Sequence, residues 1–193
     1  MRFKTWIEAQ DEPEILIPIH IAKQNHNYDC GAAALRGICE FFKVGPEDQG
    51  EFIKACDTGK RKGTHPEDLA KAAISFGLNA KILENMSVEK LLQLLSKRIP
   101  VICAVQAWGD QNDYYKLDDG HYVVAIGYGN NNIFFEDPSM HRTRGYMPYE
   151  EFMRRWHDIE FGAKQPIHHL GVAVWANTND VDAEHEDKFK KIP

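Results

Sequence analysis

The segment Gln24-Asn-His-Asn-Tyr-Asp-Cys30-Gly-Ala-Ala-Ala-Leu35 runs from a polar loop into an apolar helix. Asp29 stands where an N-cap residue is expected, which puts Cys30 in the first helical turn. One face of this helix carries apolar residues at helical spacing, namely Cys30, Ala33, Ala34, Gly37, Ile38 and Phe41. Because Ala and Gly allow other elements to pack closely, we predict that this helix is central to the fold.

The rest of the first half is predicted to be mainly helical. Further helices are expected over about 49–56, 66–77 and 87–98. A short strand is expected at 78–83, and the apolar patch at 15–19 is expected to lie against the main body.

The second half changes to a strand pattern. Short runs rich in β-branched and aromatic residues predict strands at 100–105, 121–126, 132–135 and 169–174. An Asn-rich turn at 129–132 predicts a hairpin, and an amphipathic helix is expected at 148–157. A helical half followed by a mainly antiparallel β half indicates an α+β fold with a cleft between the two.

The length of 193 residues suits one compact domain. We expect that domain to span residues 1–176, with a helical lobe at about 24–98 and a β lobe at about 99–176. The segment 177–193 is polar and charged, so we expect it to be a flexible tail.

Cys30 is the candidate nucleophile. A thiol attacks as its thiolate, and a helix N-terminus favours negative charge through unpaired amides and a partial positive charge. Gly31 beside it leaves room for a substrate backbone. For a cysteine considered alone, a buried structural thiol would be the better interpretation. The presence of partner residues of the right types reverses that preference.

His121 is the candidate base, because it opens an apolar strand at the edge of the predicted cleft. Asp137 follows the next strand, and neighbouring antiparallel strands would bring its carboxylate to the imidazole. Glu136 competes for that role, and side-chain alternation allows only one of the two to face His121. We favour Asp137. A strand-end histidine with a purely structural role is the alternative for His121.

Gln24 is the candidate oxyanion donor. It lies on the loop leading into the helix, six residues before Cys30. Its amide would donate to the oxygen of a tetrahedral intermediate together with the backbone N–H of Cys30. A surface glutamine is the alternative.

Composition and charge narrow the class of protein further. The net charge of −6 gives no argument for binding nucleic acid, and no apolar run approaches the roughly 20 residues of a membrane span. The N-terminus lacks the apolar core of a signal peptide, so a cytoplasmic location is expected. Four cysteines without a CxxC pair argue against a zinc site, and we expect neither metal nor cofactor. The cluster 60–62, Lys-Arg-Lys, is interpreted as a solvated loop.

These motifs resemble those of the C39 peptidases. The resemblance covers roughly residues 20–160 and rests on Gln24-x5-Cys30-Gly-Ala-Ala-Ala-Leu35, Gly120-His121-Tyr-Val-Val124, Asp137-Pro138 and Phe152-x3-Trp156. It implies a papain-like fold in which Cys30 is the nucleophile, His121 the base, Asp137 the orienting carboxylate and Gln24 the oxyanion donor.

The resemblance also implies a substrate and a partner. C39 peptidases typically cut the leader of a peptide precursor after a double glycine, and typical members are the N-terminal domain of an ATP-driven exporter. This chain shows neither membrane segments nor an ATP-binding domain, so it looks like a freestanding member, and an exporter would be a separate partner.

Three functions are weighed for this constellation. The leading hypothesis is a cysteine peptidase that forms an acyl-enzyme on Cys30. The second is an acyl transferase or deamidase that uses the same residues. The third is a binding module that holds peptides without cutting them. The complete ordered set favours an enzyme, because it has little structural use.

Overall fold

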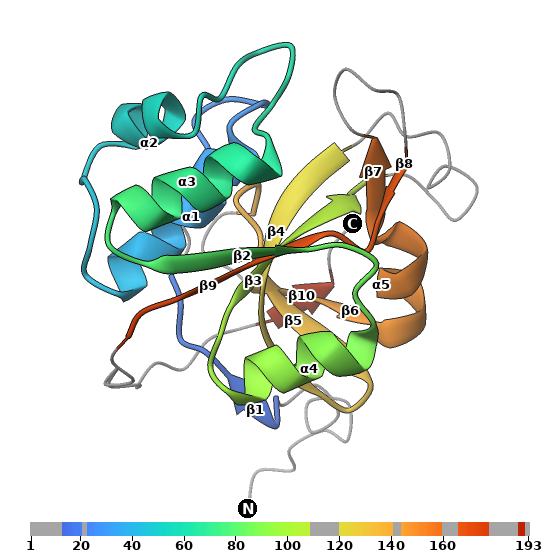
Figure 1. The fold of residues 1–193 in the computed structure, drawn as a ribbon. Helices are drawn as coiled ribbons and strands as arrows, with labels where there is room; N and C mark the ends of the chain where they lie inside the picture. The colour runs from blue at the N-terminus through green and yellow to red at the C-terminus, as the bar shows by residue number, and fades with distance from the viewer. Residues whose placement is uncertain are drawn as a thin grey trace, which may run out of the picture.

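A mainly antiparallel sheet runs through the molecule, with helices packed against it (Figure 1). The structure is a computed structural model that describes residues 13–20, 23–108, 120–140, 144–159 and 166–177 and the backbone of 189–191. The sheet has the strand order β10-β6-β5-β4-β3-β9-β2, and β1 pairs with β4. The bounds of its strands are β1 Ile15–Leu16, β2 Asn79–Leu83, β3 Val101–Gln106, β4 Gly120–Gly129, β5 Asn132–Glu136, β6 Arg144–Pro148, β9 Gly171–Trp175 and β10 Phe189–Lys191. A separate pair is formed by β7, His157–Ile159, and β8, Pro166–His168.

The helices follow the predicted segments closely. They are α1 Cys30–Phe41, α2 Gln49–Ala55, α3 Pro66–Ser75, α4 Val88–Ser96 and α5 Tyr149–Arg155. Local capping explains several starts: the Ser87 hydroxyl accepts a hydrogen bond from Lys90 N, and Pro66 occupies the first turn of α3. The predicted central helix is confirmed, since α1 contacts β3 and β4 as well as α2 and α3.

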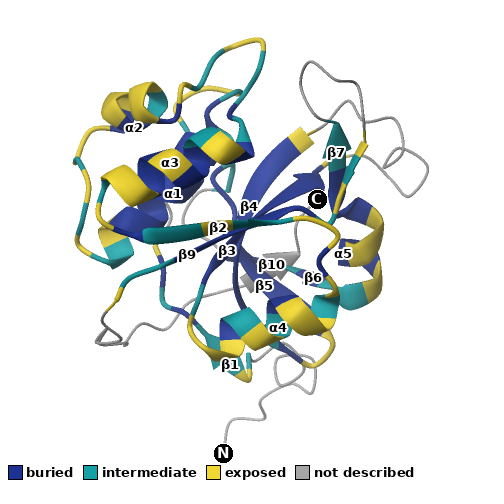
Figure 2. Ribbon diagram, viewed as in Figure 1, coloured by how far each residue is buried: buried dark blue, intermediate teal, exposed yellow. Residues whose placement is uncertain are grey.

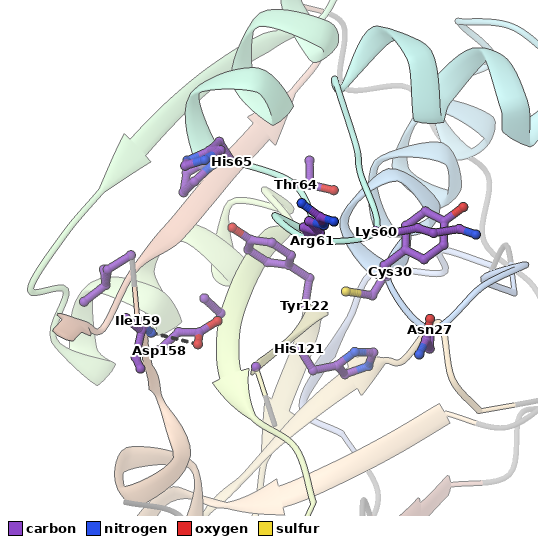
Figure 3. Close-up of a pocket in the computed structure, with 16 residues that line it drawn as sticks. Asn27, Cys30, Lys60, Arg61, Thr64, His65, His121, Tyr122, Asp158 and Ile159 are labelled. Carbon is purple, nitrogen blue, oxygen red and sulfur yellow. Dashed lines mark hydrogen bonds between the residues drawn. The ribbon is translucent and has the colours of Figure 1, made fainter. Parts of the chain in front are cut away.

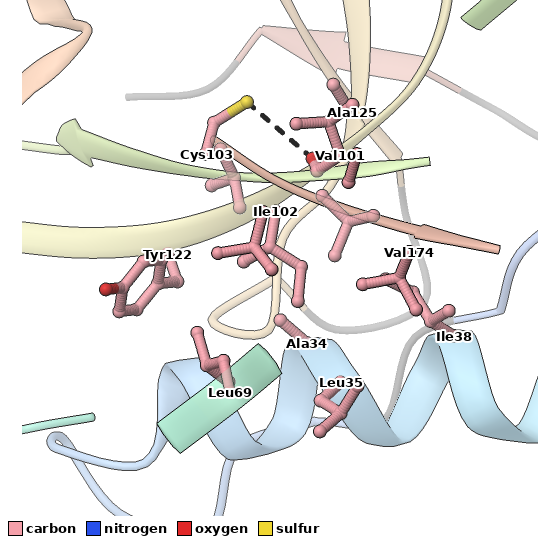
Figure 4. Close-up of a cluster of buried hydrophobic side chains, with 14 of the residues drawn as sticks. Ala34, Leu35, Ile38, Leu69, Val101, Ile102, Cys103, Tyr122, Ala125 and Val174 are labelled. Carbon is pink, nitrogen blue, oxygen red and sulfur yellow. Dashed lines mark hydrogen bonds between the residues drawn. The ribbon is translucent and has the colours of Figure 1, made fainter. Parts of the chain in front are cut away.

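The sheet is covered on both faces. Helices α1 and α3 lie above it and α4 lies below it in Figure 1. On the α1 side, Ala34 and Ile38 of α1 face Ile102 of β3 and Val174 of β9 in the close-up of Figure 4, and all four side chains are buried. Burial on both sides explains why β3 reads as a continuous apolar run rather than an alternating one (Figure 2).

The β4–β5 hairpin carries the elements that matter for the site. Asn130 and Asn131 both have positive φ, which is the conformation of a tight two-residue hairpin turn and one that Asn tolerates. The register pairs Val124 with Glu136, after a bulge between Ala125 and Gly127. This pairing brings the start of β4 beside the end of β5, as the sequence predicted.

The α+β class is confirmed, but the two halves are not separate layers. Strands β1 and β2 come from the helical half and pair with β4 and β9. The predicted flexible tail contains β10, which pairs in parallel with β6, so these three residues belong to the sheet. Residues 178–188 and 192–193 of that tail lie outside the described part of the chain.

Candidate active site

Cys30 lies in the first turn of α1, half-buried, on the wall of a pocket (Figure 3). The structure places it at the helix start that the sequence predicted. The other three cysteines are fully buried in the core, as expected for Cys39 and Cys103. Burial raises the pKa of the Cys39 and Cys56 thiols to about 12. Cys30 is therefore the one cysteine of the four whose side chain is accessible from outside the core.

The loop before Cys30 is held by Asp29, which is completely buried. Its carboxylate accepts hydrogen bonds from the backbone N–H groups of Asn25, at 3.2 Å, and His26, at 2.9 Å. Asp29 occupies the N-cap position, but its side chain makes no capping bond to the helix. The expectation of a side-chain cap is thus corrected, because the carboxylate turns back to organise the loop that carries Gln24.

His121 and Asp137 form a buried hydrogen-bonded pair. The Nε2 atom of His121 lies 2.7 Å from Oδ1 of Asp137, and the two side chains are only 2% exposed. The same oxygen of Asp137 accepts bonds from N and Oγ of Ser139, both at 2.8 Å. Glu136 instead pairs with Arg144 at 2.7 Å. The geometry therefore brings Asp137, and not Glu136, to the imidazole.

The surroundings of this pair favour a protonated, positively charged His121 and an ionised Asp137. Burial by itself would lower the pKa of His121, but hydrogen bonds from its ring to Asp137 and to Cys30 outweigh it and raise the pKa to about 10. Burial would raise the pKa of Asp137, yet its bonds to His121 and Ser139 bring it below the ordinary value. An imidazolium held by a carboxylate is thus the stable state at neutral pH.

The imidazole links the carboxylate to the thiol. Its interaction with Cys30 is one of the causes of the raised pKa of His121. Since Nε2 faces Asp137, the ring nitrogen left for the thiol is Nδ1. Figure 3 shows the Cys30 side chain next to the His121 ring in the lining of the pocket. The ring of Trp108 lies beside His121, with the two ring centroids 5.0 Å apart and the ring planes tilted by 45°.

Gln24 is near the other candidates but its amide is turned away from the pocket. Its backbone N–H donates to the carbonyl of Pro138 at 3.0 Å, which fixes it beside the Asp137 segment. Its side-chain Nε2 donates to the carbonyl of His26 at 2.7 Å, and its Oε1 is buried without a hydrogen-bond partner among the described residues. In this structure Gln24 is placed next to the site without pointing its amide into it.

The pocket in front of Cys30 has a volume of about 170 Å³. Its lining combines the thiol and His121 with a tight loop that presents Lys60 and Arg61, both exposed. This loop is closed by the paired Gly59 and Gly63. The sequence interpretation of 60–62 as a solvated loop missed that two of its cations face the candidate active site.

Two further pocket residues were not found from the sequence. Tyr122 follows His121, and burial together with the charge of Asp158 raises its pKa well above the ordinary value. Asp158 lies on β7, on the wall of the same pocket. The sequence offers little indication that Asp158 belongs to the pocket, because Asp158 lies in a polar stretch after α5. Only the tertiary fold brings it to β4.

The described residues include no group of three or more His, Cys, Asp or Glu side chains placed to hold a metal ion. None of the helices in the described ranges is both long enough and apolar enough to cross a membrane.

Comparison with solved structures shows a shared fold. A double-glycine-motif protease from an AMS/PCAT transporter, solved with a leader peptide, aligns with a TM-score of 0.63 and 20% identity, over 85% of this chain and 96% of that one. The peptidase domain of Streptococcus ComA gives 0.60 and 19%, over 81% and 98%. A C39-like peptidase from Bacillus anthracis gives 0.65 and 16%, over 88% and 100%.

These similarities confirm the papain-like α+β fold that the sequence motifs implied. A comparison with curated proteins finds no match to the chain. A comparison with protein families matches residues 18–161 to the peptidase C39 family. That match spans the α1 helix, the β4–β5 hairpin and the α5 helix, which carry the candidate residues. The chain belongs to the peptidase C39 family.

Proposed function

We propose that this protein is a cysteine peptidase that cleaves a peptide bond through an acyl-enzyme on Cys30. The observation that carries the proposal is the position of His121, hydrogen-bonded to buried Asp137 on one side and interacting with Cys30 on the other. An imidazolium next to a thiol favours the thiolate, which is the attacking form.

The reaction follows from these contacts. The thiolate of Cys30 attacks the substrate carbonyl, and a negative charge develops on the carbonyl oxygen. His121 then gives its proton to the leaving amine, so that the C–N bond breaks and a thioester to Cys30 remains. Water attacks the thioester with His121 as base, and the C–S bond breaks, which releases the acid and restores the Cys30 thiolate beside the protonated His121. Asp137 holds the ring and stabilises its charge throughout.

The oxyanion formed in the first step needs donors. The backbone N–H of Cys30 lies in the first helical turn, where N–H groups have no intrahelical acceptor. We assign the second donor to the side-chain amide of Gln24, which has to leave the His26 carbonyl and turn toward the pocket when substrate binds. Its unpartnered Oε1 supports such a change, because the present arrangement satisfies only part of the amide.

The substrate class is proposed from the family. A structural neighbour is described as a double-glycine-motif protease bound to a leader peptide. We infer that this chain also takes a peptide precursor, with a Gly-Gly leader junction as the first sequence to test, and that an exporter acts as a separate partner. Gly31 is buried against Thr64 and Tyr122, so its missing side chain serves packing and does not make the room for a substrate backbone that the sequence suggested.

The test does not require the natural substrate. A library of peptides from a digested proteome, to which precursor peptides with Gly-Gly junctions are added, is incubated with wild type and with Cys30→Ala, and new termini are read by mass spectrometry. Wild type should produce a consistent set of new termini that Cys30→Ala does not. Thermal unfolding of both proteins checks that the substitution leaves the fold intact.

Two results would overturn the proposal: cleavage retained by folded Cys30→Ala, or no cleavage by wild type. Reactions in ¹⁸O water and with an added amine then separate hydrolysis from acyl transfer. Hydrolysis places ¹⁸O in the new carboxyl terminus, whereas transfer leaves the amine there.

A further inference from the structure

Asp158 is a charged residue in the candidate active site for which the proposed reaction has no use. It lies in the middle of β7, and its side chain lines the pocket that also contains Cys30 and His121 (Figure 3). Its Oδ1 atom accepts hydrogen bonds from the backbone N–H of Ile159, at 2.8 Å, and from Nε2 of Gln106, at 3.2 Å. The carboxylate is therefore held in one orientation by two donors on the same oxygen.

The second oxygen of Asp158 has no such partner. Among the residues that the structure describes, none donates a hydrogen bond to Oδ2 and none forms an ion pair with this carboxylate. A carboxylate oxygen accepts up to two hydrogen bonds. Asp158 thus presents a fixed and unused acceptor to the pocket.

The carboxylate is also close to the reacting residues. A Cβ atom built on Gly120 would lie 2.6 Å and 2.7 Å from the two carboxylate oxygens, so a side chain at this position would displace Asp158. Gly120 immediately precedes His121. Asp158, Tyr122, His121 and Cys30 line the same pocket. A group bound by Asp158 in that pocket is therefore near the bond that Cys30 attacks.

The carboxylate is ionised under ordinary conditions. Burial raises the pKa of Asp158 to about 6, against the effect of its bonds to Ile159 and Gln106 and of the positive charge of His121. Above that pH the pocket therefore holds a partly desolvated negative charge. Lys60 and Arg61 line the pocket too, but they are exposed side chains of the loop 59–63 and form no ion pair with Asp158.

We propose that Asp158 is a specificity-determining residue that binds a lysine or arginine side chain of the substrate near the bond attacked by Cys30, at a position other than the two glycines of a Gly-Gly junction. The assignment rests on the proposed function, because it takes the substrate to be a peptide. A cation supplies a hydrogen-bond donor for Oδ2, and it adds to the positive charge of His121 in balancing a carboxylate in a partly buried place.

The test measures covalent reaction at Cys30 instead of hydrolysis. Peptidyl chloromethyl ketones occupy the cleft on the acyl side of the bond, and N-chloroacetyl peptides occupy the leaving-group side. Each series carries arginine or its neutral isostere citrulline at successive positions. Rates of Cys30 alkylation are compared at pH 7.5 for wild type, Asp158→Asn and the control Glu51→Gln, which removes an exposed carboxylate of α2 outside the pocket.

Wild type should react about tenfold faster with arginine than with citrulline at one position of one series, as expected for a charge-assisted hydrogen bond. Asp158→Asn should bring this ratio close to one, while Glu51→Gln keeps it. Alkylation by iodoacetamide, which has no side chain to bind, should be equal in the three proteins. If Asp158→Asn does not fold, Asp158→Ser serves as the second variant.

The proposal is overturned if wild type shows no arginine preference at any position, or if folded Asp158→Asn keeps it. A failure of the Asp158 proposal can be distinguished from a failure of the proposed peptidase function. An enzyme that cleaves peptides without the preference would contradict only the role of Asp158. A protein that shows the Asp158-dependent preference and cleaves nothing would contradict only the peptidase activity.

Discussion

His121 and Asp137 are sixteen positions apart in the chain, yet Nε2 and Oδ1 lie 2.7 Å apart in a buried environment. The contact depends on the β4–β5 hairpin. Its register pairs Val124 with Glu136, so the next residue, Asp137, shares a face with Val123 and His121. A change of one residue in register would present Glu136 instead. The hairpin therefore selects which carboxylate holds the imidazole.

Replacing Asp137 by Asn should lower kcat on the order of 10²-fold, with little change in KM. The amide keeps the size of the side chain but stabilises the imidazolium less and permits the wrong tautomer. Steady-state kinetics on a peptide from the library experiment measure the effect. Glu136→Gln is the matched control, and loss of activity there with retained activity in Asp137→Asn would contradict the assignment.

Peptidase activity should persist into alkaline solution and decline as the pH rises through about 10, because the pKa of His121 is raised to about 10. The imidazolium is needed to protonate the leaving amine, and it is lost above that pH. Asp137→Asn removes a hydrogen bond that raises this pKa, so the decline should move to lower pH. A pH profile of kcat for both proteins measures it, and an identical alkaline limb in the two would oppose the account.

Gln24→Ala should reduce kcat on the order of 10²-fold with KM nearly unchanged, since an oxyanion donor acts mainly in the transition state. The prediction requires the Gln24 side chain to move, because in this structure its amide donates to the His26 carbonyl. Full activity of Gln24→Ala would mean that the amide only stabilises its own loop. Thermal unfolding of the variant distinguishes a loss of activity from a loss of structure.

Asp29→Ala should destabilise the protein by about 1–3 kcal/mol, because it leaves the N–H groups of Asn25 and His26 without their acceptor. Activity should fall too, since this loop carries Gln24. Asp29→Asn keeps one acceptor oxygen and should be affected less. Urea unfolding gives the free energies, and equal values for wild type and Asp29→Ala would show that water replaces the carboxylate at no cost.

Gly31→Ala should be destabilising, although alanine in a helix is ordinarily better than glycine by about 1 kcal/mol. The added Cβ would lie 2.9 Å from Cβ and Oγ1 of Thr64 and 3.1 Å from Cδ2 of Tyr122. Thr64 is buried and bonded to Thr58, so it has little room to move. We expect a net loss of about 1–3 kcal/mol in the free energy of unfolding. A gain in stability would contradict this packing.

The sequence alone predicted those helices and turns whose local signals agree with the fold. The helix that starts at Cys30 has a regular apolar period, the Asn-rich turn permits only a tight hairpin, and Ser87 marks the start of α4. These elements were enough to predict that His121 lies next to Asp137 and that the Cys30 thiol lies at a helix start. The resemblance to the family motifs predicted the papain-like fold.

The other features of the fold and of the site depend on tertiary contacts, which no local sequence pattern predicts. Strand β6 contains Gly145 and Pro148 and lacks β-branched residues, and β10 joins it from a segment that is polar in sequence. Asp29 looked like a helix cap because a capping carboxylate and a loop-binding carboxylate occupy the same position. The loop at 59–63 reaches the pocket only through tertiary packing, so the sequence predicts a solvated cluster at 60–62, and for the same reason it does not single out Asp158.

The most direct test of the central claim is the alkylation of the four cysteines by iodoacetamide between pH 5 and 9, located by mass spectrometry in wild type and His121→Ala. The account predicts rapid labelling of Cys30 alone at mildly acid pH, slowed by His121→Ala, while buried Cys39, Cys56 and Cys103 label only after unfolding. Slow labelling of Cys30 that follows the profile of an ordinary thiol and is unaffected by His121→Ala would contradict a histidine-activated nucleophile.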